Sequence, residues 1–192
     1  MTYTQLKISG LWIVEPKIFA DTRGYFTETW KKEEFEQNIG KVYFIQDNES
    51  KSSFGVFRGL HYQEGDAAQA KFVRVIAGKV WDIAVDIRKN SPTFGQYESV
   101  ELSEDNHLQF FIPRGFAHGF LVLSKTAVFS YKVDNIYSPA SERTLNCFDM
   151  DIAIQFPVEK EILLLSEKDK KGMSLKDIAD NRILCKKMCD GK

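Results

Sequence analysis

Apolar and polar residues alternate with a period of two over many short stretches of this chain. Within 71–77, Val73 and Val75 fall on one side, and apolar residues alternate in the same way over 80–87. This period is typical of β-strands, because successive side chains of a strand point to opposite faces. Gly78 separates the two runs, and a residue that tolerates positive φ at this place predicts a turn that joins them as a hairpin.

Further short runs of this kind recur along the chain, each near a Gly, Pro, Asn or Ser. They are 10–14, 25–30, 44–48, 97–102, 109–112, 119–123 and 127–133. A short charged helix is predicted from Trp30 to Asn38, with a stop near Gly40. Many short strands with turn signals between them indicate a mainly β protein, an antiparallel sandwich or jelly-roll barrel with short helices.

The end of the chain has a different pattern. Ser174 to Asp177 has the form of a capping box, and apolar side chains then recur at roughly helical spacing. These side chains belong to Leu175, Ile178, Ala179, Leu184, Cys185 and Met188. We therefore expect a jelly-roll domain over residues 1–170 and a C-terminal helical extension, 171–192, that packs on the same domain.

The composition agrees with one compact domain. Of the 192 residues, 43% are hydrophobic and 15 are Phe, which is enough for a large core. The net charge of −1, from 26 basic and 27 acidic residues, argues against a general binder of nucleic acid or membrane surfaces. An anionic ligand must then meet a local cluster of basic side chains.

The N-terminus and the cysteines indicate where the protein works. The only apolar run near the N-terminus is short and is followed by Pro16, so it is neither a signal peptide nor a membrane-spanning helix, and we expect a cytoplasmic protein. Cys147, Cys185 and Cys189 do not make a disulfide framework. Cys185 and Cys189 could share a metal, but no histidine lies near them and helix packing is the better interpretation.

The three histidines, His61, His107 and His118, do not have the spacing of a metal-binding barrel. Such a barrel usually supplies two histidines one residue apart on a strand and a carboxylate on the next strand. Here Gln63 stands in place of the second histidine and Lys71 in place of the carboxylate. Because a cation next to a divalent metal is repelled, we expect a site without metal.

Several polar residues within the β-pattern suit an anionic ligand that carries a carbonyl group. Arg23, Arg58 and Lys71 are cations, His61 carries an imidazole that can accept a proton, and Tyr131 carries a phenol. Each also has a structural interpretation, since a strand histidine can be simply hydrogen-bonded and a tyrosine can belong to the core.

Three other polar residues have the same two interpretations. Glu28 is either an edge carboxylate in water or a ligand contact. Gln46 and Asn48 bind either a ligand or the backbone at the end of a strand.

Eight separate motifs, in order over about Ile8 to Asp169, resemble the dTDP-4-dehydrorhamnose 3,5-epimerase family. They are DTRGYFTETW (Asp21 to Trp30), FIQDNES (Phe44 to Ser50), GVFRGLHYQ (Gly55 to Gln63), QAKFVRVIAGKVWDIAVDIR (Gln69 to Arg88), SPTFG (Ser91 to Gly95), PRGFAHGF (Pro113 to Phe120), SYK (Ser130 to Lys132) and SEKD (Ser166 to Asp169). So many motifs in one order are far more specific than a single short motif. We expect no family pattern in the tail beyond Asp169 and assign no role to it from the resemblance.

This resemblance implies a cupin-type jelly roll, a homodimer that shares strands, a dTDP-sugar substrate and no cofactor. It also implies that His61 is the base, that Asp169 orients it, that Tyr131 is the acid on the opposite face, and that Lys71 steadies the enolate oxygen. The implied substrate contacts are Arg23, Glu28, Gln46, Asn48, Arg58, His118, Glu142 and Lys168.

The implied reaction inverts C3 and C5 of dTDP-4-dehydro-6-deoxy-D-glucose on the route to dTDP-rhamnose. Inversion at C3 alone, or on another nucleotide sugar, would use the same base and acid. A non-catalytic sugar-binding jelly roll is a more distant alternative, and such a protein should lack the base or the acid.

Overall fold

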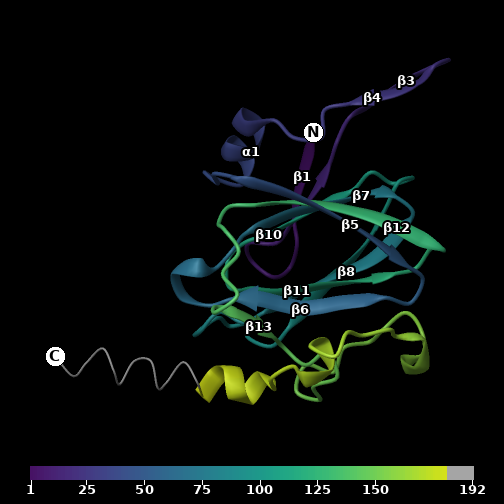
Figure 1. Ribbon diagram of the computed structural model, residues 1–192. Helices are drawn as coiled ribbons and strands as arrows, with labels where there is room; N and C mark the ends of the chain where they lie inside the picture. The colour runs from purple at the N-terminus through teal and green to yellow at the C-terminus, as the bar shows by residue number, and fades with distance from the viewer. Residues whose placement is uncertain (181–192) are drawn as a thin grey trace.

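The computed structural model describes residues 1–180, and two facing antiparallel sheets form its body (Figure 1). The first sheet has the order β1 (Thr2–Gln5), β2 (Trp12–Glu15), β10 (Gln109–Ile112), β7 (Lys71–Ala77), β12 (Thr126–Val133) and β5 (Gln46–Ser53). The second has the order β13 (Glu142–Thr144), β6 (Phe57–Gln63), β11 (Phe116–Val122), β8 (Lys79–Asp86) and β9 (Tyr97–Ser103). The predicted jelly-roll class is therefore confirmed.

The remaining elements are short. β3 (Ile18–Asp21) and β4 (Gly24–Thr27) form a separate hairpin, and α1 (Lys32–Asn38) follows it. Three single turns of 3₁₀ helix occur at η1 (Gly65–Ala67), η2 (Lys160–Ile162) and η3 (Asp169–Lys171). No helix within residues 1–180 is long and apolar enough to cross a membrane.

Three apolar clusters hold these layers together. The central cluster lies between the two sheets and includes Val73, Val80 and Phe129. A second cluster covers the outer face of the five-stranded sheet, where Leu60 and Ile83 pack against residues of the segment 145–178. That segment runs below the sheet in Figure 1. The third cluster packs α1 on the outer face of the six-stranded sheet.

The predicted hairpin at Gly78 is wrong, although its glycine does adopt a positive φ of 79°. β7 and β8 belong to different sheets, so the chain at Gly78 passes from one layer to the other. A Cβ on this residue would lie 2.2 Å from the backbone oxygen of Thr126, which leaves room only for glycine. The period of two indicated which side of each strand is buried, but it carries no information about which strand lies beside it.

The capped helix at the end of the chain is confirmed where the structure describes it, over 175–180. The Ser174 hydroxyl donates to the Asp177 carboxylate at 2.6 Å, and the Asp177 backbone N–H donates back to the Ser174 oxygen. Leu175 and Ile178 are buried in the second cluster. Leu184, Cys185, Met188 and Cys189 lie outside the described residues, and the boundary between 170 and 171 stays a prediction.

The hairpin β3–β4 projects away from the two sheets, at the upper right of Figure 1. Three aromatic side chains on it, those of Phe19, Tyr25 and Phe26, are 48%, 59% and 64% exposed. Large exposed apolar side chains gathered on one element indicate a surface that another molecule covers.

Candidate active site

A cavity of about 310 Å³ lies between the two sheets near the ends of several strands. Polar and aromatic side chains from both sheets form its wall. The lining residues are Gln46, Asn48, His61, Tyr62, Gln63, Gln69, Lys71, Phe116, Tyr131, Tyr137 and Glu142.

A β-bulge in β6 turns His61 toward this cavity. Residues three apart on a regular strand point to opposite faces, but Phe57 and Leu60 both pack in the outer cluster. The reason is that the pairing of β6 with β11 shifts by one residue between them. Gly59 lies at the shift with a φ of 139°, and a Cβ there would be 2.6 Å from the Cα of Gly119. The bulge therefore needs glycine, and it places His61 and Gln63 on the cavity wall.

His61 is held by a carboxylate from a distant part of the chain. Its Nε2 lies 2.6 Å from Oδ1 of Asp169, which is only 4% exposed. Burial alone would raise the pKa of Asp169, but hydrogen bonds from His61 and Ser166 and the charge of Lys168 lower the pKa below its usual value. The ionised carboxylate must accept the Nε2 proton, so Nδ1 carries the lone pair in the neutral imidazole.

The segment that carries Asp169 is fixed at the edge of the five-stranded sheet. The Met173 backbone N–H donates to Thr144, the Asn146 N–H donates to Met173, and both distances are 2.8 Å. The Leu175 N–H donates to the Asp149 carboxylate, also at 2.8 Å. These bonds continue the sheet past β13 and hold Asp169 against β6.

Lys71 and Tyr131 enter the cavity from the opposite sheet. Lys71 shares a face with Val73 and Val75 of the central cluster, as its parity predicts. Burial lowers the pKa of Lys71 to about 8, against the opposing effect of Asp82 and Glu142. Burial also raises the pKa of Tyr131 above its usual value, so its phenol keeps its proton at neutral pH.

Acidic and basic side chains also adjoin the cavity. Glu142 accepts a hydrogen bond from the Tyr137 hydroxyl at 2.6 Å and forms an ion pair with Lys168. Burial raises the pKa of Glu142, but Lys168 and Tyr137 outweigh it and the pKa falls below its usual value. The Arg58 guanidinium, which donates to Ser52, lies close enough to act on the charge of Tyr131.

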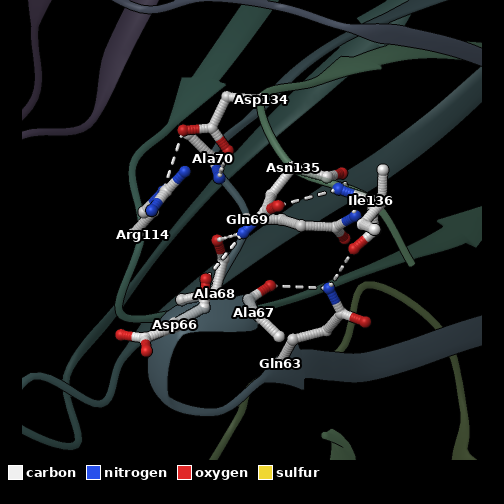
Figure 2. A network of polar contacts seen from close by, with 10 residues as sticks. All are labelled: Gln63, Asp66, Ala67, Ala68, Gln69, Ala70, Arg114, Asp134, Asn135 and Ile136. Carbon is white, nitrogen blue, oxygen red and sulfur yellow. Dashed lines mark hydrogen bonds and ion pairs between the residues drawn. The ribbon is translucent and has the colours of Figure 1, made fainter. Parts of the chain in front are cut away.

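Figure 2 shows how amide side chains tie two loops together beside the cavity. The Gln63 amide donates to the backbone oxygens of Ala67 and Ile136 at 2.7 and 3.1 Å, and its oxygen accepts from the Ser138 N–H. The Gln69 amide donates to the Asn135 backbone oxygen in the same way. Gln63, in the position of a metal-binding histidine, is therefore committed to the backbone, and no cluster of three potential metal ligands exists among the described residues.

The structure gathers most of the predicted site residues. His61, Lys71, Tyr131, Gln46, Asn48 and Glu142 line the cavity. Asp169, Lys168, Arg58 and His118 adjoin it through their contacts with lining residues. Arg23 and Glu28 are not among the residues that line the cavity. Arg23 lies at the tip of the projecting hairpin, where its side chain is 88% exposed and bound to Asp21.

Some site residues were not predicted from the sequence. Gln69, Phe116 and Tyr137 line the cavity, and Asp82 is bonded to His118 behind it. Tyr137 lies between strands, where periodicity gives no signal. Asp82 had a signal, because a carboxylate on the same face of the strand as Val80 and Ala84 needs a buried partner.

An imidazole held by a carboxylate, a protonated phenol and a buried lysine line one cavity between two β-sheets, and this set of groups suits a jelly-roll enzyme of proton-transfer chemistry. Comparison with known proteins identifies the family to which this enzyme belongs. Residues 5–177 match the family model of dTDP-4-dehydrorhamnose 3,5-epimerase. The dTDP-4-dehydrorhamnose 3,5-epimerase of Shigella flexneri is 49% identical over 178 residues, which are 92% of this chain and 97% of that protein. This chain belongs to the dTDP-4-dehydrorhamnose 3,5-epimerase family and is an isomerase.

Two solved structures are similar throughout. One is the dTDP-6-deoxy-D-glucose-3,5-epimerase of Legionella pneumophila Philadelphia 1 in complex with dTDP-4-keto-L-rhamnose. It has a TM-score of 0.87 and 46% identity, covering 91% of this chain and 93% of that one. The other, a 3'-monoepimerase from Streptomyces bikiniensis in complex with dTDP-quinovose, has a TM-score of 0.84 and 34% identity, covering 93% and 89%.

The Gln63 network leads to a prediction about stability. We expect Gln63→Glu to lower the free energy of unfolding by about 2 to 3 kcal/mol, because it turns a carboxylate oxygen toward two carbonyl oxygens that lose their donor. Urea denaturation measures the change. Gln155→Glu is the matched control, since the exposed Gln155 amide makes a single bond, to Ala153, and we expect a change within about 0.5 kcal/mol. Equal midpoints for the two variants would contradict the structural role of Gln63.

Proposed function

We propose that this chain inverts C3 and C5 of dTDP-4-dehydro-6-deoxy-D-glucose to give dTDP-4-dehydro-L-rhamnose, a step of dTDP-rhamnose biosynthesis. One observation carries the proposal: His61 and Tyr131 line one cavity from facing sheets, as an inversion requires. The family membership and the ligand of the Legionella structure support the choice of substrate.

His61 is the base of the proposed reaction. C3 and C5 both adjoin the C4 ketone, so removal of either proton places negative charge on the C4 oxygen. Asp169 keeps the Nε2 proton in place and stabilises the imidazolium that forms when Nδ1 takes the proton. Lys71 stabilises the enolate oxygen, and one preorganised donor of this kind contributes about 10²- to 10³-fold in rate.

Tyr131 is the acid of the proposed reaction. Its phenol gives a proton to the carbon from the side opposite His61, and the configuration inverts. Exchange with solvent then removes the proton from His61 and returns one to Tyr131. Because Arg58 acts to lower the pKa of this phenol, it stabilises the transient phenolate.

The other contacts of the substrate are part of the proposal. Arg58 neutralises the diphosphate, and His118 and Lys168 bind the ligand beside the dyad. Gln46, Asn48 and Glu142 supply hydrogen bonds from the cavity wall. The reaction needs neither metal nor redox cofactor, since proton transfers alone balance it. The cytoplasmic location of the protein stays a prediction.

Arg23 and Glu28 fit the proposal through a second copy of the chain. We propose a homodimer in which the projecting hairpin of each subunit crosses to the partner and brings these two residues to its cavity. The exposure of Arg23 and of three aromatic side chains on that hairpin supports this arrangement.

Tyr131→Phe tests the reaction and its two-sided geometry. In heavy water the wild-type enzyme should release product that carries deuterium at C3 and C5. The variant keeps the base and Lys71, so it should introduce deuterium into recovered substrate while product formation falls by about 10²- to 10⁴-fold. NMR of the sugar measures both quantities.

Other labelling patterns correspond to other mechanisms. Product labelled only at C3 would indicate inversion at one carbon, as in the Streptomyces relative. Release of epimerised product by Tyr131→Phe at the wild-type rate would remove Tyr131 from the mechanism. Absence of labelling and turnover with wild-type protein would contradict the proposed function itself.

Mixing two inactive variants tests the exchanged hairpin. If Arg23 acts in the partner's cavity, a mixed dimer of Arg23→Ala and His61→Ala has one intact site. Equal amounts, exchanged by mild denaturation and refolding, should recover about a quarter of wild-type activity, since about half of the dimers are mixed.

Two results would contradict the proposed exchange of hairpins. Continued inactivity of the mixture would contradict action across the subunits. Sedimentation of the wild-type chain as a monomer would contradict the homodimer. Asp47→Ala is a suitable control partner for His61→Ala, because Asp47 binds the surface Lys132 and lies outside the cavity wall.

A further inference from the structure

A buried carboxylate lies behind the cavity, in the centre of β8. Asp82 is 0% exposed and pairs with Phe120 of β11 and Val100 of β9. Its neighbours on the same face, Val80 and Ala84, both belong to the central apolar cluster. Because an unpaired buried carboxylate is very costly, its partners should explain why it is there.

Titratable groups from four elements face Asp82 or its two partners, His118 and Lys71. Nε2 of His118, on β11, lies 2.9 and 3.0 Å from the two carboxylate oxygens of Asp82. Lys71 of β7 lines the cavity and shares the inner face of the facing sheet with Val73, which belongs to the same central cluster as Val80 and Ala84, and its charge acts on Asp82. His61 of β6 pairs with His118 in the register. Glu142 of β13 acts on Lys71 from the mouth of the cavity.

Lys71 depends on these carboxylates for its charge. A buried ammonium loses its proton readily unless anions compensate for the lost hydration. Glu142 is shared with Lys168 and Tyr137. Within residues 1–180, Lys71 is the only cation that acts on Asp82 besides a protonated His118. Among the described residues, Asp82 is therefore the anion most committed to Lys71.

We propose that Asp82 is a positioning residue of the epimerisation, whose ionised carboxylate keeps Lys71 protonated and fixes the ring of His118. The proposal rests on the proposed function, in which the Lys71 cation stabilises the enolate. Burial raises the pKa of Asp82, while the charges of His118 and Lys71 oppose that effect.

The variant Asp82→Asn removes the negative charge but keeps the size and shape of the side chain, since an amide has nearly the form of a carboxyl group. In protein labelled with ¹³C at the lysine ε carbon, Lys71→Met identifies the Lys71 signal. The wild-type signal should titrate near the pKa of about 8 that burial gives Lys71, and in Asp82→Asn its midpoint should fall by a pH unit or more.

The rate should follow the same titration. Tyr131 ionises above its usual pKa of about 10, so the basic limb of kcat/KM belongs to Lys71. For Asp82→Asn this limb should move to lower pH, and kcat/KM at pH 9 should fall about tenfold for every pH unit that the limb moves. The loss should be much smaller below pH 7.

Asp86→Asn is the matched control on the same strand. Asp86 is also 0% exposed, but its partners are Arg88, Ser91 and Thr93. This variant should lose stability while the Lys71 midpoint and the basic limb stay unchanged. A change in midpoint as large as that of Asp82→Asn would show that any buried charge on β8 has the effect, and would overturn the proposal.

The remaining outcomes separate the proposal from the proposed function. An unchanged Lys71 midpoint in Asp82→Asn, with active wild-type enzyme, would show a neutral Asp82 and overturn the positioning role alone. A lowered midpoint with inactive wild-type protein would leave the link between Asp82 and Lys71 and overturn the proposed function. If Asp82→Asn does not fold, the double variant with Lys71→Met should restore folding, because it removes both charges. Failure of the double variant to fold would overturn the proposal.

Discussion

The contact between His61 and Asp169 joins two parts of the chain that are 108 residues apart, and the arrangement of the site depends on it. His61 needs the bulge at Gly59 to face the cavity. Asp169 needs the bonds of Met173 and Leu175, which hold its segment at the edge of the sheet. Much of the structure outside the barrel therefore serves to place one carboxylate beside one imidazole.

Low polarity between the sheets gives these groups their chemical properties. Charges interact strongly where water is excluded, so burial that lowers the pKa of Lys71 also strengthens its attraction for an enolate oxygen. The same burial keeps the Tyr131 phenol protonated. The barrel thus places an imidazole on one sheet, and a phenol and a buried lysine on the other, which are the groups that the proposed reaction uses as base, acid and cation.

The sequence predicted many of the strands, the face of Lys71 and the start of the last helix, because each depends on local periodicity or a local cap. It did not predict that Gly78 leads into the other sheet, since periodicity does not name a strand's neighbours. The dyad came from a resemblance between motifs, because spacing alone cannot bring residue 61 to residue 169. Asp82 was missed since its partner, His118, lies on another strand.

The catalytic value of the His61–Asp169 contact is the central claim, and Asp169→Asn measures it directly. The amide keeps the size of the side chain but no longer fixes the Nε2 proton of His61. The account predicts that kcat for epimerisation falls by about 10²- to 10⁴-fold while the thermal midpoint changes little. A kcat within a few-fold of wild type, in a folded variant, would contradict the role of the contact.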